Sequence, residues 1–276
     1  MLYKFTTVLL MFASLLASAV KAEELTIWDT SGGGMGLQAF FGRVFNKESA
    51  ELPQDLTVDI LFKDWQEIKD IPAGTIVADD GLTAPAAAKK FTKYPYASLP
   101  VVLAVHKNNP LDDLSLAEIK RIFSGRVGNW SRLGGAPGVI KLAGFAASSS
   151  IGRVFGKLAM GQNLQKNAEN DITSAISPEL IVCNSSAAGA VLVQTAENMI
   201  VFGGNALLEK VDGKYKILKV NGILPSRENI LSGKYPLQTA HAIYCSKNAP
   251  SPAINSVLKF LKNAAAGSPE LLTPRQ

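Results

Sequence analysis

Alternating strand and helix patterns are the feature of this sequence that most constrains its fold. In the first ninety or so residues, a short apolar run is followed three times by a polar or glycine-rich loop and then by a segment of helical character. The apolar runs span residues 25–28, 56–62 and 75–78. This order predicts an α/β fold with a parallel sheet. In such sheets, ligands bind beyond the carboxyl ends of the strands.

The composition agrees with a folded chain and excludes several functions. Of 276 residues, 47% are hydrophobic and 18% are charged, so a large core is available and global disorder is excluded. The net charge of +5 suits an anionic ligand. We expect no nucleic-acid partner, because no basic run with interleaved aromatic residues occurs. The two cysteines and two histidines lie far apart and do not match a zinc site, so we expect no metal and no other cofactor.

The N-terminus has the pattern of a secretory signal peptide. Lys4 precedes an apolar run at residues 8–17, and small residues follow up to Ala22. This pattern predicts that residues 1–22 are cleaved off after Ala22. The apolar run is too short to span a bilayer. The mature protein is then exported. Export permits a disulfide between Cys183 and Cys245, although we expect two separate buried thiols.

A serine-rich loop, Ser148–Ser150, joins a predicted strand at 139–143 to a predicted helix at 154–160. Serines in this place cap the helix, and the free N–H groups at its positive end suit an anion. Arg153 in the first turn can add a charge-assisted donor. Taken alone, this stretch favours the simpler interpretation, an ordinary serine cap with Arg153 in solvent.

The position that several polar residues share carries more weight than any one loop. Thr30, Ser31, Asp80 and the serines 148–150 all come directly after predicted strands. The glycine-rich loop that begins at Gly32 is neither a Walker A loop nor a dinucleotide fingerprint.

Three blocks of the chain have a recognisable pattern. Residues 114–130 read LSLAEIKRIFSGRVGNW, in which Ser115 and Glu118 form a capping box. The other two blocks are residues 189–203 and 220–237. Together the blocks resemble the phosphate-binding periplasmic proteins, which are the substrate-binding proteins of phosphate ABC importers. The blocks occur in the family's order, and the likeness covers nearly the whole mature chain. It implies the type 2 periplasmic binding protein fold, with two α/β lobes, hinge strands between them and an oxyanion held in the cleft.

The resemblance also implies where the lobes divide. One lobe would comprise residues 23–98 and 237–276, and the other residues 99–236. Hinge strands would lie around 100–105 and 240–244. A closing helix is predicted over residues 250–265, and we expect the last residues to be frayed.

The site residues that the resemblance implies match this chain in part. Asp80 stands where the family has an aspartate that accepts a proton from the protonated anion, with Asp79 as a one-residue alternative. A carboxylate there discriminates against anions that carry no proton. The expected ligand-binding residues are Thr30, Ser31, Gly32, Asp80, Ser148, Ser149, Ser150 and Arg153.

The chain departs from the family pattern at four places. Phe145 replaces the family's arginine, Ser150 replaces a glycine, and Ile151 replaces a hydroxyl donor. Residues 63–65, Lys-Asp-Trp, stand where the family has a pair of serines. We expect Arg153 or Ser148 to compensate for these missing donors.

The function that follows is a periplasmic solute-binding protein, not an enzyme, that delivers phosphate or a related small oxyanion to the membrane permease of an ABC importer. We expect a monomer. The alternative is a binding or sensory module with another ligand or a protein partner and no role in transport. A serine hydrolase is disfavoured, because neither His106 nor His241 lies in a catalytic motif.

Overall fold

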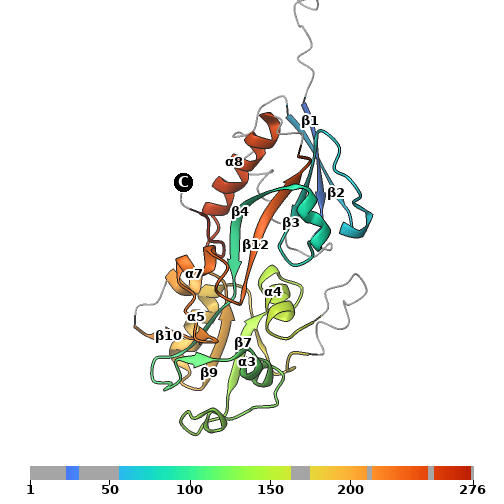
Figure 1. Ribbon diagram of the computed structural model, residues 1–276. Coiled ribbons are helices and arrows are strands. Elements are labelled where there is room, and N and C mark those ends of the chain that lie inside the picture. The colour runs from blue at the N-terminus through green and yellow to red at the C-terminus, as the bar shows by residue number, and fades with distance from the viewer. Residues whose placement is uncertain (1–22, 31–55, 163–174, 210–212, 248–251, 275–276) are drawn as a thin grey trace, which may run out of the picture.

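A computed structural model describes residues 23–30, 56–162, 175–209, 213–247 and 252–274 of the chain. These residues form two five-stranded sheets with helices packed around them, one sheet in each half of the elongated molecule (Figure 1). The α/β class predicted from the sequence is therefore confirmed. The predicted signal peptide, and Ser31 and Gly32 of the first loop, lie outside the described residues.

The first sheet has the strand order β2-β1-β3-β12-β4. Its strands are β1 (Glu23–Asp29), β2 (Leu56–Phe62), β3 (Thr75–Asp79), β4 (Thr92–Pro100) and β12 (Gln238–Cys245). Strands β2, β1 and β3 are parallel, as the sequence pattern predicts. Strand β12 lies between β3 and β4 and runs antiparallel to both. The repeat of strand and helix patterns does not predict this antiparallel strand.

The second sheet has the order β10-β5-β9-β7-β8. Its strands are β5 (Val102–His106), β7 (Lys141–Phe145), β8 (Ile181–Cys183), β9 (Met199–Gly203) and β10 (Tyr215–Ile217). A separate two-stranded pair is formed by β6 (Asp113–Leu114) and β11 (Lys219–Val220). Strand β7 is parallel to its neighbours β8 and β9, so polar residues that follow β7 lie at a carboxyl edge.

The helices cover the faces of the sheets. They are α3 (Leu116–Phe123), α4 (Ser150–Leu158), α5 (Ser186–Thr195), α6 (Ala206–Glu209), α7 (Arg227–Leu231) and α8 (Pro252–Ala266), with 3-10 turns η2 (Trp65–Glu67), η3 (Ala86–Lys90) and η4 (Trp130–Leu133). The capping box predicted for Ser115 and Glu118 is present at the start of α3. None of the helices in the described residues is long and apolar enough to cross a membrane.

The chain passes between the halves at Val101, which separates β4 from β5. The Val101 N–H donates to the Leu237 carbonyl at 2.7 Å, and the Tyr235 hydroxyl donates to the Val101 carbonyl at 2.9 Å. The two crossing segments are therefore bonded side by side just before β12 begins. The lobe boundaries themselves stay a prediction.

The C-terminal segment after α8 is packed up to Pro274, which corrects the expectation of frayed residues for that stretch, and residues 275–276 lie outside the described residues. Leu272 is 8% exposed and belongs to the core of the second half. Its backbone exchanges two hydrogen bonds of 2.8 Å with Ser98 of β4. Apolar burial and backbone pairing thus hold this tail in place, up to Pro274 where the described residues end.

Candidate functional site

Asp79, at the carboxyl end of β3, is the centre of a buried hydrogen-bond network. Its side chain is fully buried. The Trp65 indole N–H donates to its Oδ2 at 2.8 Å, and the Gly81 N–H donates to its Oδ1 at 2.7 Å. A buried carboxylate with this many donors is satisfied within the protein. Asp79 therefore holds the loops around it and has little capacity left for a ligand.

Two threonine hydroxyls also face Asp79. Thr30 Oγ1 lies 3.0 Å from Asp79 Oδ2 and 3.0 Å from the Ala78 carbonyl. Thr83 Oγ1 lies 2.8 Å from the same Oδ2 and 3.1 Å from the Thr30 carbonyl. Each hydroxyl has one proton and finds its acceptors inside the network. Thr30 therefore ties the end of β1 to β3, rather than offering a free donor.

Asp80 faces away from this network and toward the second half of the molecule. Its Oδ1 accepts the Leu82 N–H at 3.0 Å, which leaves Oδ2 for other contacts. The next residue, Gly81, has a φ of +80°, and a Cβ placed on it would lie 2.8 Å from the Ala240 carbonyl oxygen of β12. Only glycine allows the turn to approach β12 this closely. The turn thus fixes Asp80 at the junction of β3 and β12.

Arg153 reaches Asp80 from helix α4 of the other half. Its Nη2 lies 3.7 Å from Asp80 Oδ2, and each of the two side chains is 8% exposed. Nη2 is buried and makes no hydrogen bond to any residue that the structure describes. Buried charges are normally both paired and hydrogen-bonded. The pair of Arg153 and Asp80 therefore leaves one buried guanidinium nitrogen, Nη2, available to donate a hydrogen bond.

The surroundings of Asp80 favour its protonated form. Burial, and next the charge of Asp79, raise the pKa of Asp80 to about 6, although the Leu82 N–H and Arg153 act in the opposite direction. Asp80 consequently changes charge close to neutral pH. A carboxyl group of this kind can either donate a proton to an anion or accept one from it.

Ser149 forms the N-cap of helix α4. Its Oγ accepts the Gly152 N–H at 3.0 Å and donates to the Ala146 carbonyl at 2.7 Å. The Arg153 N–H bonds the Ser149 carbonyl at 2.9 Å. The first N–H groups of a helix have no partner within the helix. Because the Ser149 side chain accepts only the Gly152 N–H, the N–H groups of Ser150 and Ile151 are not bonded by this cap. They point along the positive end of the helix dipole.

Two further buried polar side chains come from strand β12. Thr239 is 4% exposed and His241 is 6% exposed. Thr239 Oγ1 and both ring nitrogens of His241 lack hydrogen-bond partners among the described residues. The His241 ring packs edge-on against Tyr96, with 6.1 Å between ring centroids. Burial lowers the pKa of His241 to about 4, so the ring is neutral at pH 7.

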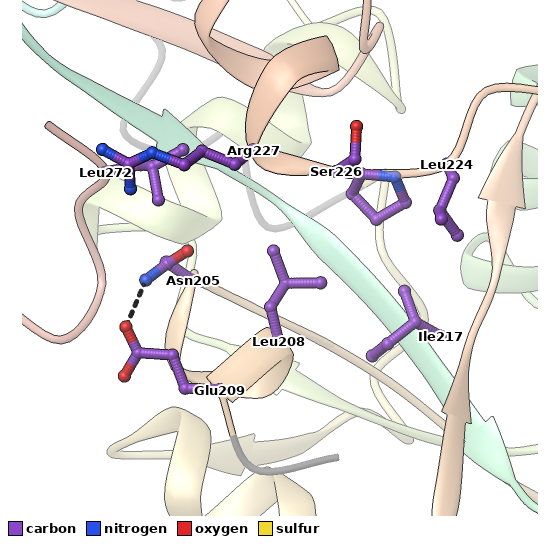
Figure 2. A pocket seen from close by; sticks show the side chains of 9 residues that line it. Asn205, Leu208, Glu209, Ile217, Leu224, Ser226, Arg227 and Leu272 are labelled. Carbon is purple, nitrogen blue, oxygen red and sulfur yellow. Dashed lines mark hydrogen bonds between the residues drawn. The ribbon is translucent and has the colours of Figure 1, made fainter. Parts of the chain in front are cut away.

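A separate pocket of about 430 Å³ lies in the second half, beside the C-terminal tail (Figure 2). It is lined by Asn205, Leu208, Glu209, Ile217, Leu224, Pro225, Ser226, Arg227 and Leu272. The Asn205 amide donates to Glu209 at 2.9 Å, and Arg227 donates to the Thr273 carbonyl. Its charged groups are therefore already bonded, and Glu209 would repel an anion. None of the residues predicted to bind the ligand lines this pocket.

The structure brings most of the described candidate residues to one place. Thr30 contacts Asp79, whose neighbour Asp80 faces Arg153, and Arg153 lies one turn after the Ser149 cap. Ser150 begins α4, while Ser148 is exposed just before it. The interpretation of Arg153 as a solvent-exposed residue is excluded by its burial.

Sequence reasoning missed the hydrogen bonds of Trp65 and Thr83 to Asp79, and the burial of Thr239 beside the Asp80 turn. Trp65 stands in the segment where the family has serines, and its indole is bonded to Asp79 instead. The adjacent Asp64 caps η2 by accepting the Gln66 N–H at 3.0 Å. No local pattern indicates these long-range contacts, because they depend on how β3, η2 and β12 are placed by the sheet.

The family model described as the PBP superfamily domain matches residues 25–264. Among curated proteins, the phosphate-binding protein PstS of Bacillus subtilis is 25% identical over 181 residues, which cover 64% of this chain and 54% of the relative. The protein SphX of Synechococcus elongatus is 28% identical over 203 residues, 67% of this chain and 57% of the relative. The chain thus spans a little over half the length of these curated relatives.

Solved structures share the fold at low identity. An ABC-type phosphate transport receptor from Vibrio cholerae aligns with a TM-score of 0.63 at 18% identity, covering 91% of this chain and all of that one. PstS from Borrelia burgdorferi aligns with a TM-score of 0.62 at 13% identity, covering 92% of this chain and all of that one. The two-lobe periplasmic binding protein fold predicted from the sequence is therefore confirmed.

Proposed function

The chain belongs to the PBP superfamily, and we propose that it is an exported solute-binding protein that holds phosphate, or a related small oxyanion, between its two halves. One observation carries the proposal. Arg153 from α4 and Asp80 from the β3 turn face each other in a buried place, and the Arg153 Nη2 donor has no hydrogen-bond partner among the described residues.

The groups around this place suit an oxyanion that carries a proton. Arg153 supplies a charged donor, and the start of α4 supplies the N–H groups of Ser150 and Ile151. Asp80 supplies an acceptor for the proton of the anion. An ionised Asp80 repels an anion without a proton, which favours phosphate over sulfate.

Thr30 and Ser149 have a supporting role in this proposal. The hydroxyl protons of Thr30 and Ser149 are taken by acceptors within the protein. Thr30 fixes Asp79 and hence the Asp80 turn, and Ser149 fixes the first turn of α4. Ser31, Gly32 and Ser148 remain proposed ligand contacts.

We further propose that the partner is the membrane permease of an ABC importer, that the working location is the periplasm after cleavage of residues 1–22, and that the protein acts as a monomer without catalytic activity. The names of the relatives support the link to phosphate transport. The match of the family model over residues 25–264 supports a binding function.

Calorimetric titration of the purified mature chain with phosphate tests the proposal, with sulfate as the comparison and X-ray scattering to detect compaction. We expect saturable binding of phosphate at micromolar concentration or below, much weaker binding of sulfate, and a smaller radius of gyration with phosphate. Absence of phosphate binding would reject the proposal. Tight binding of a different solute would keep the binding role and change the ligand.

A further inference from the structure

We propose that Thr239, on the crossing strand β12, contacts the bound oxyanion directly and donates its hydroxyl proton to it. This inference rests on the proposed function. It adds to the site a residue on a strand, whereas the residues predicted from the sequence lie in loops and at the start of a helix. A hydroxyl from β12 would also link the ligand to a segment that joins the two halves.

The first observation is the place of the Thr239 side chain. It is 4% exposed, and it pairs in register with Leu99 of β4 just after the chain has passed from one half to the other. A Cβ placed on Gly81 would lie 3.2 Å from the Thr239 Cβ. The Thr239 side chain therefore lies against the turn that carries Asp80.

The second observation is that Thr239 Oγ1 is buried without a hydrogen-bond partner in the described parts of the chain. The same is true of Arg153 Nη2, which approaches Asp80 from α4. Helix α4 packs against β12, so these two unpaired groups come from neighbouring elements (Figure 1). Buried polar atoms in proteins are nearly always paired, and a cluster of unpaired ones indicates a missing bonding partner.

The chemistry of the cluster identifies the class of that partner. A guanidinium can only donate, and a hydroxyl can donate while Asp80 accepts. A tetrahedral oxyanion with one proton satisfies all three groups, because it accepts from two and donates to the third. Thr239 would then replace a hydroxyl that the family pattern has at Ile151 or at residues 63–65.

A structural role is the competing explanation, with a buried water bonded to Thr239 in place of a ligand. The two are separated by comparing Thr239→Val, which removes the hydroxyl at similar volume, with Thr239→Ser, which keeps it. Thr75→Val is the matched control, since Thr75 is also buried in the first sheet but begins β3, at the opposite end from Asp79. Phosphate affinity and the thermal midpoint of the anion-free protein are measured for each.

We expect Thr239→Val to weaken phosphate binding about tenfold or more, the usual effect of removing one hydrogen bond to a charged group. Thr239→Ser and Thr75→Val should stay within roughly threefold of the wild type. The anion-free midpoint of Thr239→Val should be unchanged or higher, because an unpaired buried hydroxyl is removed.

Wild-type affinity in Thr239→Val would overturn this inference and leave the proposed function intact. Equal weakening in the valine and serine variants, with a lowered anion-free midpoint, would assign Thr239 a structural role and also overturn it. A wild-type protein that binds no phosphate would reject the proposed function, and this inference with it.

Discussion

Arg153 Nη2 lies 3.7 Å from Asp80 Oδ2, and this buried pair joins helix α4 of one half to the turn after β3 of the other. The ion pair is too long for a hydrogen bond. Its two partners can therefore both turn toward a third group.

Replacing Arg153 tests the charged donor. We expect Arg153→Gln to reduce phosphate affinity about 100-fold, because it removes a charge-assisted bond in a buried place. It should also lower the free energy of unfolding near pH 8, since Asp80 is left buried without its counter-charge. Calorimetry and urea unfolding measure the two effects. The exposed Arg132, changed to Gln, serves as control. Undiminished affinity in Arg153→Gln would contradict the site.

Replacing Asp80 tests selectivity. At pH 8 the ionised Asp80 should repel sulfate and accept the proton of phosphate. In Asp80→Asn we expect the ratio of phosphate affinity to sulfate affinity to fall about tenfold or more, which corresponds to roughly 1.4 kcal/mol. Competition titrations give the ratio, with the exposed Asp112→Asn as control. A ratio equal to that of the wild type would show that Asp80 does not discriminate between anions with and without a proton.

Two serine caps of the same geometry distinguish a loss of phosphate affinity at the site from a general loss of stability. Ser149 caps α4 with φ −76° and ψ 159°, and Ser226 caps α7 with φ −73° and ψ 156°. Changing either to alanine should lower the free energy of unfolding by about 1 kcal/mol. Only Ser149→Ala should also weaken phosphate binding. An equal loss of affinity in Ser226→Ala would count against the start of α4 as part of the site.

Gly81 sets the approach of the Asp80 turn to β12. Gly81→Ala combines a φ of +80° with a contact of 2.8 Å to the Ala240 oxygen. Gly134 has a φ of +81° with open space around it. In both variants the left-handed conformation should lower the free energy of unfolding by about 1 kcal/mol, because alanine disfavours it. Gly81→Ala should lower it further, because the turn must also move away from β12. Thermal unfolding compares them, and equal losses would show that the turn has room to shift.

Acid stability should depend on His241 and Asp80 in opposite directions. The unfolded chain protonates His241 below about 6.5, whereas burial lowers its folded pKa to about 4, so its contribution to stability is lost as the pH falls between these values. The folded pKa of Asp80 is about 6 against 3.8 unfolded, so its effect on stability becomes more favourable as the pH falls from 6 to 3.8. Each effect is about 3 kcal/mol.

The two effects largely cancel in the wild type, so variants are needed to see them. His241→Gln should make the protein gain stability on going from pH 6.5 to 4, and Asp80→Asn should make it lose stability. The charged or titratable side chains that face His241 are Asp79 on β3 and Tyr96 on β4. Urea unfolding at several pH values measures the slopes. Parallel pH profiles for both variants would contradict the assignment.

Local patterns predicted the elements well and the network poorly. Alternating and apolar runs placed β1, β2 and β3 correctly, and the Ser115 capping box placed α3, because these signals depend on neighbours in the chain. The apolar run at 99–105 is divided at Val101 into β4 and β5, since the chain changes sheets there. Cys183 and Cys245 are free buried thiols, as expected.

In the candidate site, too, local patterns predicted some residues, whereas long-range contacts could not be predicted. Asp80 was selected from its place after a predicted strand, and Arg153 from its place in the first turn of a predicted helix. The different surroundings of Asp79 and Asp80 depend on long-range contacts that have no local sequence signal. The role of β12 was hidden because it comes from the far end of the chain and pairs antiparallel to β3.

The place of β12 in the first sheet has a consequence for the order of assembly. Strands β5, β7, β8, β9 and β10 all fall between residues 102 and 217, so one half can complete its sheet from a continuous stretch. The other half has a gap between β3 and β4 until residues 238–245 arrive. A growing or refolding chain should therefore pass through a species with one finished half, while the turn after β3 that carries Asp80 still lacks its antiparallel neighbour β12.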